Sequence, residues 1–158
     1  MIAALVNSAY RGDSSRVGWT NEADLFDGQR TDEKEVRDLL NSKESMFLLC
    51  LRGTDLVGSV LLRKKGTTAY LGMLVVNPQL QRTGIGSSLI AASEAAVRNS
   101  WGMKRISMTV ISCRSELIAF YERRGYCRTG LIEPLPTGSP SVARVAGLEL
   151  EVLEKELE

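Results

Sequence analysis

Apolar residues in the first part of the chain recur at helical spacing. Residues 2–11 place them at intervals of three and four, and an Arg-Gly pair then provides a helix exit. A second helix is predicted over about residues 33–42, because Asp32 can cap its first turn, Glu35 completes the capping pattern and one face is apolar. The chain is therefore expected to start with two short amphipathic helices.

Three runs rich in apolar residues follow and predict consecutive strands, over residues 46–52, 56–63 and 69–76. The links between them are short and contain glycine, threonine and charged residues, as turns do. Links of this length favour antiparallel hairpins, so these three strands should form a meander.

Helical and strand-like patterns alternate in the second half of the chain. The expected elements are a helix over 84–99, a strand over 105–111, a short helix over 115–124 and two closing strands within 126–135 and 144–157. A helix that connects one strand to the next as a crossover gives a parallel pair inside a mixed sheet. Because there is no internal repeat, linker or low-complexity tract, the sequence predicts one α/β domain spanning residues 1–158.

Composition narrows the class of protein. The chain has 158 residues, of which 44% are hydrophobic and 25% charged, as in a globular domain with a substantial core. Twenty Lys and Arg against nineteen Asp and Glu give a net charge of +1, so no global field indicates a nucleic acid or an anionic membrane as partner. No apolar stretch approaches the roughly 20 residues that span a bilayer, and the first residues lack a secretory pattern. The three cysteines form no C-x-x-C pair. We expect a cytoplasmic protein, monomeric or homodimeric, that binds neither nucleic acid nor membrane.

The sequence contains no histidine. Ser-His-Asp triads, Cys-His dyads and zinc sites that use histidine are therefore excluded. No metal is expected, and any chemistry must use carboxylates, Tyr, Cys, Lys, backbone groups or a cofactor.

The stretch VVNPQLQRTGIG, over residues 75–86, ends an apolar run and leads into the longest predicted helix. It is either an ordinary strand-to-helix turn or a backbone cradle for a phosphorylated ligand. The first N–H groups of a helix are unpaired and carry partial positive charge, which suits a phosphate. Gly84 and Gly86 would let a ligand approach the main chain, and Arg82 adds a positive charge. The stretch matches neither a P-loop, since no G-K-[ST] follows, nor a Rossmann fingerprint, since the third glycine is missing.

Two segments, LVVNPQLQRTGIGSSLI (residues 74–90) and AFYERRGY (residues 119–126), together resemble the GNAT superfamily of N-acyltransferases. LVVNPQLQRTGIGSSLI is similar to its acyl-CoA-binding segment, in which an apolar strand and a proline precede Q/R-x-x-G-x-G/A at the start of a long helix. AFYERRGY, about 35 residues later, resembles the family's A-x-x-Y-x-x-x-G-F/Y segment. The resemblance favours the cradle and implies the family's fold, which is α/β with a mixed, mostly antiparallel central sheet, a splayed parallel pair and flanking helices. The family's first strand has no counterpart here, because the first predicted element corresponds to its first helix.

The resemblance implies a site for acetyl-CoA in the gap between the splayed strands. Backbone groups of Leu74, Val75 and Val76 would bond the pantetheine arm. The pyrophosphate would lie at the glycine turn, against Gln81, Arg82, Thr83, Gly84, Ile85, Gly86 and Ser87. Three nearby arginines either meet the 3′-phosphate or form a solvated face, namely Arg123, Arg124 and Arg128.

Tyr121 is the candidate general acid implied by the resemblance. Its phenol, with an ordinary pKa of about 10, stays protonated at neutral pH and suits a departing thiolate whose pKa is about 8.5. The alternative is an aromatic residue that only packs in the core. A backbone N–H near Val75 would meet the oxyanion.

The general base is left open. Some family members carry a Glu near the position of Thr109, and an Asn is frequent at the position of Arg114. Glu22 and Asp24, in the polar loop GWTNEADLF, are the candidate catalytic carboxylates, and Trp19 with Glu22 would bind substrate. The alternatives are exposed loop charges with a packed tryptophan, or a water relay with no dedicated base.

These residues predict an N-acetyltransferase that moves an acetyl group from acetyl-CoA to the primary amine of a small molecule or peptide, by direct attack in a ternary complex. The alternative is a non-catalytic sensor or structural module that binds acyl-CoA. The absence of a carboxylate on the strand favours the second hypothesis, and Tyr121 favours the first.

Overall fold

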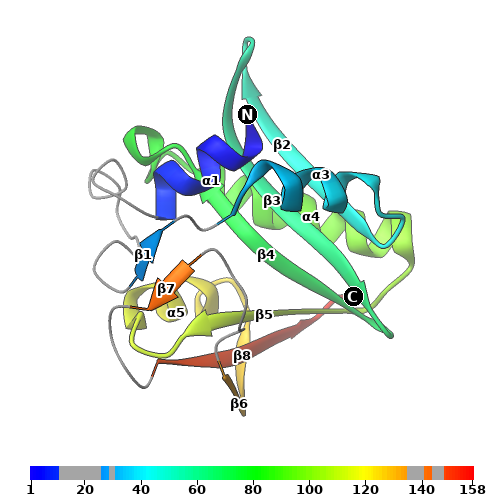
Figure 1. The fold of residues 1–158 in the computed structure, drawn as a ribbon. Helices are drawn as coiled ribbons and strands as arrows, with labels where there is room; N and C mark the ends of the chain where they lie inside the picture. The colour runs from blue at the N-terminus through cyan, green and yellow to red at the C-terminus, as the bar shows by residue number, and fades with distance from the viewer. Residues whose placement is uncertain (11–25, 29–30, 135–140, 144–147) are drawn as a thin grey trace.

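A mixed sheet of six strands, in the order β2-β3-β4-β5-β8-β6, forms the centre of the structure (Figure 1). The structure is a computed structural model, and it describes residues 1–10, 26–28, 31–134, 141–143 and 148–158. The predicted meander is present as the antiparallel strands β2 (Ser45–Arg52), β3 (Asp55–Lys65) and β4 (Thr68–Val76). The predicted order of elements is confirmed, with ends that differ by one to a few residues.

The second half of the sheet departs from chain order. Strand β5 (Arg105–Ile111) is parallel to β4, while β8 (Glu149–Glu156) lies between β5 and β6 (Cys127–Pro134) and is antiparallel to both. The last strand of the chain is therefore an inner strand, and β6 forms the edge of the sheet.

Helices cover both faces of the sheet. Helices α1 (Ile2–Tyr10) and α3 (Glu33–Asn41) lie across one face, in front of β2, β3 and β4 in Figure 1, and α4 (Ile85–Trp101) crosses behind them. Helix α5 (Ser115–Glu122) packs into the same core as α4. A short 3₁₀ turn, η1 (Pro78–Leu80), connects β4 toward α4.

The alternation of side chains along β3 explains this layering. Val60 and Leu62 belong to the larger core with α4 and α5, whereas Leu61 belongs to a second cluster with Leu5 and Val6 of α1. Successive residues of a strand face opposite sides of the sheet, so a continuous apolar run buries both faces.

The parallel pair is splayed, as the resemblance implied. Strands β4 and β5 pair only at Ala69↔Ile106 and Tyr70↔Ser107, and the two ribbons then separate (Figure 1). The β3–β4 register shifts between Ser59 and Leu61, so that β4 carries an extra residue there, and Met73 adopts a φ of 46°. Such a bulge bends the strand that contains it. We attribute the separation of β4 from β5 to this bulge.

Two details differ from the sequence analysis. Asp32 caps α3 by accepting from the Glu35 N–H at 2.8 Å, but the Glu35 carboxylate accepts from the Thr31 hydroxyl instead of closing the capping box. A second small sheet, which the sequence analysis did not predict, pairs β1 (Phe26–Gly28) with β7 (Ser141–Ala143).

Candidate functional site

A cavity of about 270 Å³ lies between the end of β4, the start of α4 and one side of α5, with Tyr10 of α1 at its wall. Eight of the ten residues predicted to bind the cofactor line it: Leu74, Val75, Val76, Gln81, Arg82, Gly84, Gly86 and Ser87. The other two lie outside the lining. The Thr83 hydroxyl donates to the Leu80 carbonyl, and the Ile85 side chain packs against the core.

Two backbone carbonyls at the end of β4, in the segment predicted to bond the pantetheine arm, already accept hydrogen bonds from side chains. The Tyr10 hydroxyl donates to the Leu74 carbonyl at 2.9 Å, and the Gln81 amide donates to the Val76 carbonyl at 3.3 Å. Each carbonyl has a second lone pair, so a ligand can share them or displace these side chains. The first contact ties α1 directly to the wall of the cavity.

The two glycines of the turn serve different purposes. Gly84 is the N-cap of α4 with φ 89° and ψ −1°, a left-handed conformation that glycine adopts without strain. Gly86 has an ordinary φ, and a Cβ added there would lie 3.7 Å from Val76 Cγ2 and 3.9 Å from Phe120 Cζ, which is normal contact. The turn therefore requires Gly84, but neither the backbone nor the packing requires Gly86. A side chain at Gly86 would instead take up part of the space between α4, Val76 and Phe120.

The start of α4 is suited to an anion. In the part of the chain that the structure describes, no side chain caps this helix, and its first turn lines the cavity through Gly84, Gly86 and Ser87. Helix N-termini leave N–H groups without helical partners and carry partial positive charge. Arg82, exposed and with a φ of 68°, lines the same cavity.

Arg124 supplies a second guanidinium to this region. It stacks on the Phe120 ring, with its central carbon 3.5 Å from the ring centroid, and Nη1 donates to the Phe120 carbonyl at 2.8 Å. Nε and Nη2 donate to the Ser87 hydroxyl at 3.1 and 2.5 Å. Partial burial and the neighbouring Arg123 lower the pKa of Arg124, but arginine stays charged at neutral pH. Of the other two arginines considered, Arg128 makes an ion pair with Glu151 at 3.4 Å, outside the cavity lining.

Tyr121 is both a core aromatic and part of the cavity wall. It is 5% exposed, and its ring makes edge contacts with Phe120 and Tyr126 at centroid distances of 5.4 and 5.9 Å. Burial, with a smaller contribution from Tyr10, raises the pKa of Tyr121 well above its usual 10, while Arg114 opposes the shift. The two alternatives raised by the sequence are thus compatible, and the phenol keeps its proton at any ordinary pH.

The positions where the chain departs from the family pattern have defined surroundings. The Thr109 hydroxyl lies 2.8 Å from the Tyr70 hydroxyl, a contact that bridges β5 and β4 near the end of their pairing. Arg114 is 5% exposed, lines the cavity and is the N-cap residue of α5, where its carbonyl accepts from the N–H groups of Leu117 and Ile118.

The residues predicted to bind or activate the acceptor amine are not among those that the structure describes. Trp19, Glu22 and Asp24 lie outside the described residues. Among the residues that are described, no cluster of three or more potential metal ligands occurs, and no helix is long and apolar enough to cross a membrane. Tyr10 and Phe120, which the sequence analysis did not assign to the site, line the cavity. The contact of Tyr10 spans 64 residues, and no local pattern indicates it.

Comparisons with known proteins agree with the resemblance. A family model described as Acetyltransferase (GNAT) family matches residues 16–126. No curated protein sequence matches the chain. Solved structures do match: the ribosomal-protein-S18-alanine N-acetyltransferase from Escherichia coli is 15% identical, with a TM-score of 0.65 over 81% of this chain and 78% of that one.

Two further structures were solved with coenzyme. A GNAT family acetyltransferase from Elizabethkingia anophelis with acetyl-CoA bound is 15% identical, with a TM-score of 0.63 over 80% of this chain and 84% of that one. The PaiA N-acetyltransferase from Thermoplasma acidophilum in complex with coenzyme A is 21% identical, with a TM-score of 0.56 over 77% and 65%. At such identities the likeness shows a shared fold.

Proposed function

Because this chain belongs to the GNAT acetyltransferase family, we propose that it transfers an acetyl group from acetyl-CoA to the primary amine of a small molecule or peptide. The amine attacks directly, in a ternary complex. Residues 1–158 act as one cytoplasmic domain, monomeric or homodimeric. The observation that carries the proposal is that the glycine turn, the end of β4 and Tyr121 line one cavity.

The cavity suits the coenzyme at its phosphate end. The start of α4 offers backbone N–H donors and partial positive charge. The missing side chain at Gly86, which packing against Val76 and Phe120 does not require, leaves room for a ligand there. Arg82 and Arg124 add two positive charges to the lining. These features together would offset the negative charge of the phosphates. An uncharged ligand would need none of them.

Tyr121 supports the reaction at the other end. When bound, acetyl-CoA supplies a thioester whose carbonyl carbon an amine can attack. Burial keeps a proton on the Tyr121 hydroxyl. A departing thiolate, whose conjugate acid has a pKa of about 8.5, is a weaker base than this buried tyrosinate, so the hydroxyl would act as a general acid by donating a hydrogen bond to the sulfur as the C–S bond breaks. A backbone N–H near Val75 would stabilise the developing oxyanion.

The acceptor side rests on the sequence alone. Glu22 and Asp24 are proposed as candidates for the general base, and Trp19 with Glu22 for contacts to the amine. A water relay is an equal alternative for removing the proton.

A second function is favoured by one observation. Among the described residues that line the cavity, three are arginines and none is a carboxylate. A protein that holds acyl-CoA as a sensor or structural ligand needs the arginines and does not need a base.

The variant Tyr121→Phe separates these two functions. It keeps the ring and removes only the hydroxyl, so kcat should fall by roughly 10²-fold, as for the loss of a general acid. Coenzyme A affinity should stay within about threefold, because the hydroxyl acts mainly in the transition state. The assays are release of free thiol with a panel of amines and calorimetric binding of coenzyme A. Since the pKa of Tyr121 lies above 10, its ionisation should cause no loss of wild-type rate below about pH 10.

Tyr126→Phe is the matched control. Tyr126 is 2% exposed, packs against Tyr121 and lies outside the cavity lining. Its hydroxyl has no hydrogen-bond partner among the described residues, so its removal should leave turnover intact. Wild-type turnover in Tyr121→Phe would show that Tyr121 is not the general acid and only packs in the core. Tight coenzyme binding without thiol release, with every amine tested, would establish the sensor.

A further inference from the structure

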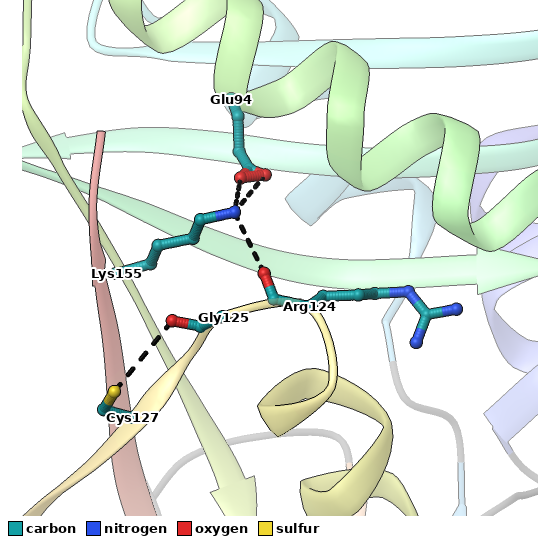
Figure 2. Close-up of polar contacts among 5 residues, drawn as sticks. All are labelled: Glu94, Arg124, Gly125, Cys127 and Lys155. Carbon is teal, nitrogen blue, oxygen red and sulfur yellow. Dashed lines mark hydrogen bonds and ion pairs between the residues drawn. The ribbon is translucent and has the colours of Figure 1, made fainter. Parts of the chain in front are cut away.

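Lys155, on the inner strand β8, joins two elements that flank the cavity. Its ammonium donates to the two Glu94 carboxylate oxygens at 2.5 and 3.3 Å and to the Arg124 carbonyl at 2.9 Å (Figure 2). The Glu94 side chain is 10% exposed and the Lys155 side chain 29%. One partly buried cation therefore connects the middle of α4 to the turn that follows α5.

The path of Lys155 is fixed by a glycine. Gly125 has a φ of 95°, and a Cβ added there would lie 3.2 Å from Lys155 Cε. A side chain at this position would be strained and would also press on the lysine. The turn after α5 thus has the one residue type that lets Lys155 pass and reach the Arg124 carbonyl.

Arg124 is held to α4 at two levels. Its carbonyl is linked through Lys155 to Glu94, and its guanidinium reaches back to the Ser87 hydroxyl. Ser87 and Glu94 are seven residues apart, which is two turns or about 10 Å on the same face of a helix. Figure 2 shows the Arg124 side chain extending away from the ammonium. The bond from Lys155 to the Arg124 carbonyl therefore fixes the Arg124 backbone, and this position determines how far the guanidinium extends toward the start of α4.

The Arg124 guanidinium retains donors for a ligand. A guanidinium has five N–H groups. Contacts with described residues use three of them, on Ser87 and on the Phe120 carbonyl. Because Arg124 and Ser87 both line the cavity at the start of α4, a phosphate there can accept the remaining two.

We propose that Arg124 binds the phosphates of the coenzyme and that Lys155, with Glu94, is the positioning residue that sets its reach. This inference rests on the proposed function, because it takes the ligand to be coenzyme A. A buried ion pair is in itself weak evidence for stability, since apolar residues often replace one without loss. The third bond, to the Arg124 carbonyl, is what gives this pair a position-setting role.

Calorimetric titration with coenzyme A tests the inference without turnover. Lys155→Met and Arg124→Met should each weaken binding about tenfold, and the double variant should be hardly weaker than either single variant, because both changes remove the same contact. Binding of pantetheine, which lacks the phosphates, should be unchanged in all three. The matched control is Glu156→Gln, the next residue on β8, whose 80% exposed side chain pairs with Arg105 instead. This control should bind coenzyme A as the wild type does.

Three results would overturn the inference. They are unchanged coenzyme A binding by folded Lys155→Met, equal losses for coenzyme A and pantetheine, and additive losses in the double variant. If Lys155→Met melts below the assay temperature, Glu94→Gln is titrated in its place, with the same outcomes. Wild-type protein that binds no coenzyme A overturns the proposed function as well. Wild-type binding with unaffected variants overturns both roles inferred here, of Arg124 and of Lys155, and leaves the proposed function standing.

Discussion

Replacing Gly86 by aspartate would separate ligand binding at α4 from the folding of the helix. Gly86 is the second residue of α4, has a helical φ and tolerates a Cβ at ordinary contact distances from Val76 and Phe120. An acidic residue in the first turn of a helix is stabilising by about 0.3–1 kcal/mol, because it faces the positive end of the helix dipole. Gly86→Asp should therefore leave the free energy of unfolding unchanged or slightly raised.

The same carboxylate should oppose the coenzyme. Two unit charges about 5 Å apart interact by roughly 3 kcal/mol at an effective dielectric constant of 20. Solvent at the open side of the cavity and salt reduce this value. We expect a loss of at least about 1.4 kcal/mol of binding free energy, which is tenfold in Kd.

The assay compares three variants by calorimetry with coenzyme A and by thermal unfolding. Gly86→Asn has nearly the shape of aspartate without its charge, and Gly86→Ala adds only the Cβ. Asparagine reports the loss of space, and the difference between aspartate and asparagine reports the charge. That difference should exceed tenfold at low salt and shrink at high salt, since screening weakens the repulsion.

Equal coenzyme A affinity of Gly86→Asp and Gly86→Asn would refute the reasoning, because no anion would then lie at this turn. A large drop in the melting temperature of Gly86→Ala would refute a different step. It would mean that the helix or its packing does require glycine there.

Two further predictions concern charge and pH. Arg82→Ala keeps the Cβ at a position with left-handed backbone (φ 68°) and removes the rest of the side chain, including its positive charge. Coenzyme A binding should weaken more at low salt than at high salt, and a salt-independent loss would indicate a role in packing. Burial raises the pKa values of Tyr121 and Tyr126 above their ordinary 10, so above that pH the unfolded chain loses these protons first and the free energy of unfolding should fall. Urea unfolding between pH 9 and 11 should show a steeper fall for wild type than for Tyr126→Phe, and equal slopes would contradict the shift.

Much of the fold could be predicted because its signals are local. Asp32 caps the helix that it was expected to cap, and the two hairpins follow from short links between apolar runs. The glycine turn was also predictable, since its residues are contiguous and a motif describes them. Most element ends differ by a residue or two from those predicted, as fraying and assignment allow, and the last strand begins at Glu149, inside its predicted range.

Contacts between distant segments could not be predicted in this way. The Tyr10 hydroxyl meets a carbonyl 64 residues away, and Lys155 meets Glu94 61 residues away. In the sequence, Lys155 is one charge in the alternating run ELEVLEKELE, where a solvated lysine is the ordinary expectation. Only the folded structure shows that the Lys155 side chain points toward α4, because its direction depends on the position of Glu94 on that helix.

The inner position of β8 has a consequence for how the protein folds as it is made. Strand β6 emerges from the ribosome before β8, yet β8 is its neighbour in the sheet. Until β8 has been made, β6 lacks its neighbour in the sheet, and one edge of β5 is unpaired and could pair with a strand of another chain. The pairing that closes this gap joins Arg105 to Glu156, a contact of high sequence separation, and such contacts form slowly. Because Lys155 arrives on the same strand, its contacts with Glu94 and with the Arg124 carbonyl can form in the nascent chain only after β8 has been made.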